Sequence, residues 1–581
     1  MDRREFIQTL AISSATLGLA PFSAAEDALY ELAPFGNARI LHTCDVHAQL
    51  LPVHFREPNV NLGFGKGYNK PPHIVGDALL KHYDIAADSR LAHALSHVNF
   101  SELAQRYGAM GGMAYMATLT KRLRSEVAGN ACIHLDSGDL WHGSYTALQS
   151  QGADMVQAAN LLGIDAMTGH WEFTYPAEVL RKNIAASQGE FLAQNIHLKE
   201  EALFDGVEAY DEDSGLAFKP YTMREVGGRR IAIIGQAFPF TPISNPQRFI
   251  QDWTFGIQRQ ALQSLIDTIR KEEQPQAVIL LSHNGADLDV TMAADLQGLD
   301  FILGGHTHDN LYQPRVVNNT VIVNTGCVGK FVGCLDIEFG SSGVRDYRWR
   351  MLPLFSNLLA ADSAMQAHID QVRAPYQQML AEPLAQTKNE LYRRGNFNGT
   401  MDQLILDALR ETNNSDIALS PGFRWGTSLP AGATITMEDV YNATAITYPE
   451  TYTRDMRGGD LKTILEEIAD NLYHRDPYYQ QGGDMVRTGG LKYTLLPAAT
   501  LGKRIDNLRL SNDQLLQADK MYRVSGWATQ TQSAGAPIWQ VLADYLRAHK
   551  QVHPMLDGLP EISGVAGNPG IADYPSELMG K

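Results

Sequence analysis

The chain has 581 residues, which is too long for one hydrophobic core, so we expect at least two domains. Hydrophobic residues make up 44% and charged residues 19%, an ordinary globular composition that excludes a largely disordered chain. The net charge of −17 disfavours a nucleic-acid partner, because a nucleic-acid-binding protein of this size normally has a basic surface.

The first residues are typical of an export signal. Arg3 and Arg4 precede a mostly apolar run that ends near Phe22, and small residues follow as far as Ala25. A charged start, a short apolar stretch and a small-residue end indicate a cleaved signal peptide rather than a membrane anchor. The twin arginines with x-Phe-Ile resemble a twin-arginine translocation signal, and an ordinary Sec signal is the alternative. We therefore expect residues 1–25 to direct the protein to the periplasm, with no membrane contact after export.

After this signal, apolar runs typical of strands alternate with helical patterns. The expected strands are 38–45, 131–136, 230–235, 277–282 and 301–304, and the clearest helical patterns are 112–127 and 253–271. Alternating strands and helices predict a layered α/β domain. Polar residues follow each strand, at the end where open α/β sheets bind their ligands.

The rest of the chain divides further. Residues 50–110 interrupt the alternation, and we expect them to form a long ordered insertion near the site. Residues 358–380 carry apolar side chains at helical spacing, which predicts a linker helix. We thus predict a signal peptide (1–25), a metallohydrolase domain (26–357), the linker helix, and a C-terminal substrate-binding α/β domain (381–581).

Five clusters of potential metal ligands each end a predicted strand or begin the next loop. They are Asp45-Val-His47, Gly138-Asp139, Gly169-His170-Trp171-Glu172, Ser282-His283-Asn284 and Gly304-Gly-His306-Thr-His308. In an extended segment, residues i and i+2 point the same way, so the Asp-x-His and His-x-His pairs can serve one centre. Nitrogen and oxygen ligands without thiolates suit manganese, zinc or iron. One carboxylate can bridge two ions, and Asp139 is the natural candidate.

This order of clusters resembles the calcineurin-like metallophosphoesterases, and within them the 5′-nucleotidase superfamily. The resemblance covers nearly the whole mature chain. It implies an N-terminal four-layer α/β-β/α metallophosphoesterase domain and a C-terminal 5′-nucleotidase-type α/β domain. It also implies two ligand groups that share one aspartate. One metal would be held by Asp45, His47, Asp139 and His308, and the other by Asp139, His170, His283 and His306.

One motif departs from the phosphatase pattern. The family's Gly-Asn-His-Glu-Phe is Gly-His170-Trp171-Glu-Phe here, so histidine replaces the asparagine ligand and tryptophan replaces the histidine that assists the leaving group. An alkoxide leaving group needs a positioned proton donor. A sulfur leaving group needs far less help, because thiol pKa values lie near about 8.5. The substitution is therefore tolerable if the bond broken is S–S rather than P–O.

The same variant resembles the SoxB family of the periplasmic thiosulfate-oxidising system. Two further runs carry this resemblance, Ala48–Pro58 and Gly482–Arg487. It implies a sulfate thiohydrolase that hydrolyses the S–S bond of a cysteine S-thiosulfonate on the SoxYZ carrier protein and releases sulfate. The sulfone group is tetrahedral and anionic like phosphate, so a phosphatase-like site can receive it.

The C-terminal part supplies the predicted substrate contacts. Arg424, in Ser-Pro-Gly-Phe-Arg-Trp-Gly, resembles the family's arginine-bearing loop, and its planar guanidinium suits a tetrahedral oxyanion. We predict Asp139, Trp171 and Arg424 as catalytic residues, and Arg424, Trp171, Asn284 and Asp484 as substrate-binding residues.

Two alternatives remain open. A periplasmic 5′-nucleotidase or UDP-sugar hydrolase of the same fold would need an aromatic clamp for the base, and the segment 482–490 offers none that we can identify. A binding protein with a vestigial site would lack ligands, and none is missing. As cofactors we expect two Mn²⁺, with Zn²⁺ as the alternative. Twin-arginine export carries folded proteins, so manganese could be loaded in the cytoplasm without competition from periplasmic copper.

Overall fold

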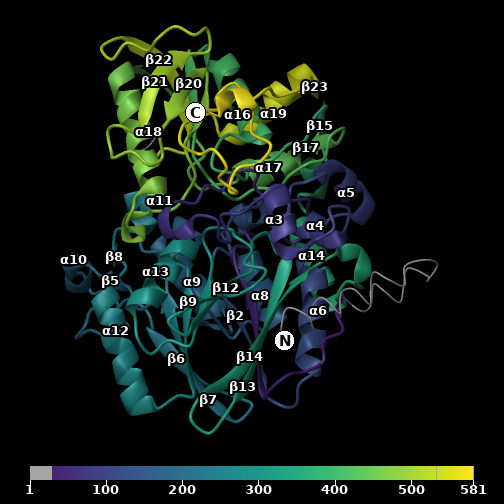
Figure 1. Cartoon of the computed structure of the whole chain (residues 1–581), viewed down its shortest axis with the longest axis vertical. Coiled ribbons are helices and arrows are strands. Elements are labelled where there is room, and N and C mark those ends of the chain that lie inside the picture. The colour runs from purple at the N-terminus through teal and green to yellow at the C-terminus, as the bar shows by residue number, and fades with distance from the viewer. Residues whose placement is uncertain (1–28, 532, 580–581) are drawn as a thin grey trace.

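A computed structural model describes residues 29–531 and 533–579. The predicted signal peptide, residues 1–25, lies outside the described part. The chain forms two α/β regions, with the N-terminal region below and the C-terminal region above in the view of Figure 1.

Two six-stranded sheets form the centre of the N-terminal region. In spatial order, the first contains β14 (Val344–Pro353), β13 (Phe331–Phe339), β1 (Ala38–Thr43), β2 (Cys132–Asp136), β3 (Ala166–Met167) and β4 (Glu190–Phe191). The second contains β11 (Arg315–Val317), β12 (Thr320–Asn324), β10 (Phe301–Gly304), β9 (Ala277–Ser282), β7 (Arg229–Gln236) and β6 (Tyr221–Val226). Strands β1, β2 and β3 run parallel, as do β7, β9 and β10.

The two sheets pack face to face, with helices on their outer sides. Ile40 and Leu135 of the first sheet share one buried cluster with Ile233, Ile279 and Leu303 of the second. Helices α6 (Met113–Ser125), α8 (Ala153–Leu162) and α14 (Ser363–Arg373) contribute to the core on the outer face of the first sheet. Helices α12 (Arg259–Thr268) and α13 (Ala286–Asp295) cover the second. The expected four-layer metallophosphoesterase fold is confirmed.

The strands expected from the sequence all form, and one predicted helix begins later than expected. Residues 253–271 were expected to be helical throughout. Trp253–Phe255 instead forms strand β8, which pairs with β5 (Ile196–Leu198), and the helical turns start only at Arg259. Trp253 is buried among aromatic rings of the N-terminal region, and this tertiary packing overrides the local periodicity.

The linker also differs from the prediction of one continuous helix. It consists of α14 and of α15 (Gln377–Leu380). Asp362 caps α14 by accepting a hydrogen bond from the backbone of Met365. Pro375 lies between the two helices, where its missing N–H and its ring are incompatible with an uninterrupted helix.

Residues 50–110 are ordered and contact both regions. They contain α3 (Gly76–Tyr83), α4 (Arg90–Leu95) and α5 (Phe100–Tyr107). Arg56 forms an ion pair with Glu390 at 3.0 Å, and its guanidinium lies 4.0 Å from the ring centre of Tyr392. Backbone hydrogen bonds add to this contact, among them Ser428 N–H to the carbonyl of His54. The insertion thus bridges the N-terminal region and the C-terminal one.

The C-terminal tail closes over the same insertion. The backbone N–H of Asn61 donates to the carbonyl of Gly570, and that of Val75 donates to the carbonyl of Pro569. Further along, the imidazole of His97 lies 2.7 Å from the carboxylate of Asp573. The tail also pairs with the rest of the C-terminal region: its strand β24 (Glu561–Ile562) pairs in parallel with β20 (Leu491–Leu495).

The described residues of the C-terminal region form three small sheets and four longer helices. The sheets are β18 (Thr451–Arg457), β22 (Met521–Trp527), β16 (Ile417–Ser420) and β19 (Arg487–Gly489); β17 (Thr434–Thr436), β15 (Pro383–Thr387) and β23 (Gln551–Val552); and β21 (Ile505–Leu510) with β20 and β24. The helices are α16 (Thr400–Asn413), α17 (Met437–Thr444), α18 (Gly458–Tyr473) and α19 (Ile538–His549). Two buried clusters, one around Leu404 and one around Leu465, form its core.

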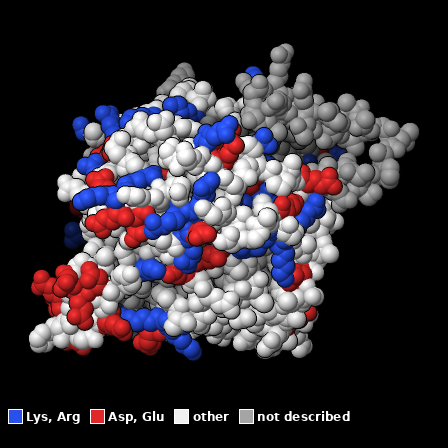
Figure 2. All heavy atoms as spheres, turned by 90° about the horizontal axis from the view of Figure 1, so that it is seen from below, with Lys and Arg blue, Asp and Glu red and all other residues white. Residues whose placement is uncertain are grey.

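On the face of the molecule shown in Figure 2, acidic and basic side chains are interspersed. Within residues 29–531 and 533–579, no helix has the length and apolar character that crossing a bilayer would require.

Candidate metal centre

All seven predicted ligands meet in one buried centre. Two groups of side chains each bring their donor atoms within 4.8 Å of one another. The first group is Asp45, His47, Asp139 and His308, and the second is Asp139, His170, His283 and His306. These are the groups that the family resemblance implies, with Asp139 in both. The chain therefore has a dinuclear-type metal site built from histidine and aspartate.

The ligands lie in the loops that follow parallel strands. Several of these loops take the left-handed backbone conformation, which side chains other than glycine rarely adopt. Asp45, His47, Asp139, His306 and His308 all have φ between 49° and 74°. The expectation of extended Asp-x-His and His-x-His segments is therefore wrong. Tight left-handed turns, rather than a strand's alternation, direct these side chains inward, and such strained residues typically mark functional sites.

The carboxylate of Asp139 is central to the arrangement. Its Oδ2 atom lies 3.1 Å from Nε2 of His283, 3.4 Å from Nδ1 of His170 and 3.6 Å from Nε2 of His47. The neighbouring rings of His47 and His308 bring their Nε2 atoms within 2.9 Å of each other. Oδ2 of Asp139 therefore lies close to histidines of both ligand groups, as expected of a carboxylate that bridges two metal ions.

Burial governs the charges of these groups. It lowers the pKa of His47 to about 4 and lowers the pKa of His306 and His308 well below the usual value, so these imidazoles are neutral and can donate lone pairs. Burial alone would raise the pKa of Asp139, but His283 and His170 hold it well below its usual range. Asp139 is thus an anion at neutral pH.

The donor atoms fit divalent metal ions. Ring nitrogens of His47, His306 and His308 are buried without a hydrogen-bond partner among the described residues. Such an arrangement is costly for the protein alone, since unsatisfied polar groups destabilise a buried site. Imidazole and carboxylate donors without thiolate match manganese, zinc or iron, as the sequence indicated.

Glu172 supports the loops that carry the ligands. It is fully buried, and its carboxylate accepts hydrogen bonds from the backbone N–H groups of His170 and Leu140 at 2.8 Å each. A weaker bond comes from the N–H of Asp139 at 3.4 Å. One carboxylate thereby ties the loop after β2 to the loop after β3.

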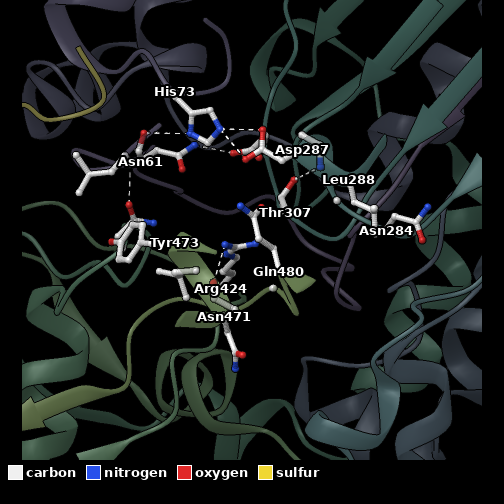
Figure 3. Close-up of a pocket in the computed structure, with 18 residues that line it drawn as sticks. Asn61, His73, Asn284, Asp287, Leu288, Thr307, Arg424, Asn471, Tyr473 and Gln480 are labelled. Carbon is white, nitrogen blue, oxygen red and sulfur yellow. Dashed lines mark hydrogen bonds and ion pairs between the residues drawn. The ribbon is translucent and has the colours of Figure 1, made fainter. Parts of the chain in front are cut away.

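A polar pocket adjoins the metal centre and is lined by both regions and by the insertion (Figure 3). Arg424 lines it and lies near the middle of the view, where its Nη2 donates to the carbonyl of Gly483 at 2.7 Å. Its Nη1 is buried without a hydrogen-bond partner in the described chain. Across the pocket, His73 of the insertion pairs with Asp287 at 3.0 Å.

Two of the other three predicted substrate contacts, Asn284 and Asp484, are already bonded to protein. Asn284 lines the pocket, but its amide donates to Asp289 at 3.2 Å and accepts from Gln236 at 3.2 Å. Asp484 is buried beside the guanidinium groups of Arg424 at 3.4 Å and Arg487 at 3.2 Å. Asp484 accordingly orients arginines.

Arg394 is a candidate functional residue that sequence reasoning missed. It is buried, and its Nη2 donates to the carbonyl of Thr307, between the ligands His306 and His308. Two of its nitrogens have no hydrogen-bond partner among the described residues. Two adjacent arginines just before the Asn-Phe-Asn-Gly run at 396–399 were the available signal.

Gly482 approaches a metal ligand more closely than any other residue type could. A Cβ atom on Gly482 would lie 2.0 Å from Nε2 of His306, and the glycine has a φ of 75°. The C-terminal region is therefore in direct contact with the metal centre, and the Gly-Gly pair explains why no large side chain lies at this point.

Trp171 is packed rather than exposed to the pocket. Its side chain is buried, its ring contacts rings from both regions, and its backbone N–H donates to Oδ1 of Asp139 at 2.8 Å. One neighbouring ring belongs to His142, which the sequence analysis did not single out.

Comparisons with known proteins agree with this arrangement. Residues 383–544 match the model of the 5′-nucleotidase C-terminal domain. The solved structure of the sulfate thiohydrolase SoxB of Thermus thermophilus is 33% identical, with a TM-score of 0.86, over 92% of this chain and 98% of that one. The UshA protein of Yersinia enterocolitica is 26% identical over 71% of this chain and 80% of that protein. The trifunctional nucleotide phosphoesterase YfkN of Bacillus subtilis is 24% identical over 70% of this chain, which spans only 30% of that longer protein.

Replacing Asp139 tests the shared carboxylate. In Asp139→Ala we expect metal content, measured by elemental analysis, to fall from about two ions per chain to below one, because each ligand group loses its only shared donor. Asp287→Asn is the control, since Asp287 lies in the pocket but outside both groups. An Asp139→Ala protein that keeps two ions would contradict a bridged centre.

Gly482→Ala tests the contact with His306. We expect it to lose metal and to melt at a lower temperature, because the new methyl group displaces the imidazole. Gly483→Ala is a matched control: its φ of 77° gives the same backbone strain, but its Cβ would meet nothing closer than 3.8 Å. If the two variants bind metal equally well, the close approach has no functional consequence.

Proposed function

The chain belongs to the SoxB family of sulfate thiohydrolases within the 5′-nucleotidase superfamily, and from this we propose its reaction. The enzyme hydrolyses the S–S bond of a cysteine S-thiosulfonate on the SoxYZ carrier protein and releases sulfate. The observation that carries the proposal is the pair of complete ligand groups beside a buried Trp171, at the position where phosphatases have a histidine.

The change at Trp171 favours a sulfur leaving group. The indole N–H is not a useful acid, so this position gives no proton to a departing alkoxide. A persulfide anion leaves without protonation at neutral pH, because its conjugate acid is stronger than a thiol of pKa about 8.5. The hydrolytic machinery is thus retained while the assistance specific to P–O cleavage is lost.

Metal ions would be held by the two groups that share Asp139. When bound, they supply Lewis acidity that lowers the pKa of water and polarises the sulfone group. We propose Mn²⁺, with Zn²⁺ as the alternative, since the donors are nitrogen and oxygen only. The twin-arginine motif supports export of the folded, loaded protein to the periplasm.

The chain's own residues bind and orient the substrate. Arg424 has an unpaired Nη1 and lines the pocket, so it can hold the sulfone oxygens and offset the charge that develops on them. The carbonyl of Gly483 fixes the other side of its guanidinium. The released sulfur anion remains on the carrier cysteine.

A carrier-borne substrate must arrive on a thin arm. The pocket lies between the two regions and the insertion, and its volume of about 70 Å³ is far too small for a folded protein. A flexible segment that ends near the modified cysteine can enter. Among the described residues that line this pocket, Tyr473 is the only tyrosine, phenylalanine or tryptophan, so the pocket lacks the paired rings that would clamp a nucleobase.

The reaction is tested with labelled water and three substrates. We expect one oxygen-18 atom per released sulfate from the carrier conjugate, because water attacks the sulfone sulfur. A short peptide that ends in the modified cysteine is expected to react more slowly than the carrier, and AMP much more slowly still. Absence of solvent oxygen in the sulfate rules out hydrolysis at sulfur. If free thiosulfate is turned over as fast as the carrier conjugate, the proposal that the substrate arrives on a flexible arm of the carrier is wrong.

A second prediction concerns Trp171→His. If the leaving group needs no acid, restoring the histidine gives no gain in kcat on the thiosulfonate, although slow phosphatase activity on a phosphate monoester can emerge. The measurement is kcat on both substrates, with metal content verified. A large rate gain on the thiosulfonate would show that the leaving sulfur does need a proton.

A further inference from the structure

Four aromatic rings next to the metal centre form a closed cycle of contacts, which we call the aromatic cycle. Its members are His142 and Trp171 from the N-terminal region and Phe423 and Trp425 from the C-terminal region. His142 stacks on Trp171 with ring centres 4.8 Å apart and an angle of 16° between the planes. Trp171 meets Phe423 edge to face at 5.4 Å, Phe423 stacks on Trp425 at 5.4 Å, and Trp425 meets His142 edge to face at 5.2 Å.

The cycle flanks Arg424, the residue to which the proposed function assigns the sulfone oxygens. Arg424 lies between Phe423 and Trp425 in the sequence, and both neighbours belong to the cycle. The rings of Phe423 and Trp425 pack in the cycle on either side of Arg424, while the guanidinium of Arg424 bonds to Gly483 on the pocket side. A further arginine, Arg393, donates to the carbonyl of Trp425 at 3.3 Å.

The N-terminal half of the cycle is itself tied to the metal ligands. Trp171 follows the ligand His170 directly, and its N–H donates to Asp139. His142 lies three residues after Asp139, in a loop that is fixed by Trp141, whose N–H donates to Glu172 and whose carbonyl accepts from Tyr175. The same two loops thus hold metal ligands and the aromatic surface against which the Arg424 loop packs.

We propose that His142 and Trp171 are positioning residues, which hold the Arg424 loop in register with the metal centre through the aromatic cycle. The tryptophan at position 171, where phosphatases have a histidine, therefore has two effects. It removes a proton donor, and it supplies the broad ring on which the substrate-binding arginine depends. The role of Arg424 in this proposal rests on the proposed function, but the packing does not.

Stacking rather than hydrogen bonding holds His142 in the cycle. Its side chain is 1% exposed, and neither ring nitrogen has a hydrogen-bond partner among the described residues. A ring of similar size and no polar atoms should therefore replace it. Edge-to-face and offset-stacked pairs are favourable beyond the area that they bury, so removing the ring costs the pairs with Trp171 and Trp425 and the edge-to-face pair with the ligand His47 at 6.4 Å.

The test compares His142→Ala with His142→Phe. Two readouts are measured on metal-loaded protein: amide hydrogen exchange in residues 421–426, and the affinity for inorganic sulfate by calorimetry. For His142→Ala we expect faster exchange in that segment and sulfate affinity weakened about tenfold, with metal content unchanged. On the thiosulfonate, KM should rise more than kcat falls. His142→Phe should restore the slow exchange, the sulfate affinity and the KM of the unchanged protein.

His93→Ala is the matched control. His93 is also a buried imidazole among aromatic rings, those of Phe100, Tyr107 and Phe355, but it lies in α4 of the insertion. We expect this variant to lower the melting temperature without changing exchange in residues 421–426 or the affinity for sulfate. A similar change in both histidine-to-alanine variants would reduce the effect to general destabilisation and overturn the proposal.

Two further outcomes would overturn it. Unchanged exchange in residues 421–426 of His142→Ala means that the ring does not hold the loop. If His142→Phe fails like His142→Ala while its loop stays protected, His142 acts through a polar contact instead. A protein that is inactive on every thiosulfonate contradicts the proposed function alone, because the exchange measurement needs no substrate.

Discussion

Two carboxylates and five imidazoles lie buried with their donor atoms only a few ångströms apart, where water cannot solvate them. Isolated charges in such a place are costly, so the protein must supply opposite charges, hydrogen bonds or metal ions. Much of the architecture serves this requirement. Two face-to-face sheets bring the ends of their parallel strands to one place, and left-handed turns direct Asp45, Asp139 and His308 inward. Glu172 then fixes the loops from behind, through backbone N–H groups rather than through the ligands' side chains.

The C-terminal region contacts the metal ligands themselves and does not merely cover the metal centre. Gly482 touches His306, and Arg394 donates to the backbone between His306 and His308. Because these contacts involve metal ligands, any shift between the two regions changes the ligand geometry as well as the pocket. The insertion restricts such shifts through the ion pair between Arg56 and Glu390 and through its backbone bonds to the C-terminal region. The enzyme thus resembles a single preorganised body, in which electrostatic stabilisation needs little rearrangement.

The sequence predicted this centre well and its surroundings poorly, for a physical reason. Ligands such as His283 follow short apolar strands, and both the strand and the polar end are local signals. The family pattern then assigned each ligand to a group. His142 carries no local signal and Arg394 only that of its neighbour Arg393, because their roles come from partners far away in the chain, Trp425 and Thr307. The predicted helix wrongly included Trp253 for the same reason, because tertiary packing rather than local periodicity makes this residue part of a strand.

The tail that closes over the insertion has a consequence for how the chain folds. Asn568 donates to the carbonyl of Gly63, a contact between residues 505 positions apart. Contacts of such large sequence separation form late, since a long loop must be closed before they contribute any stability. During synthesis, the backbone bonds of Asn61 and Val75 to Gly570 and Pro569 cannot form until the chain has been made as far as Gly570. The wall of the pocket that His73 provides therefore becomes fully native only after residues 569 and 570 have been synthesised, and a shorter nascent chain lacks the complete pocket.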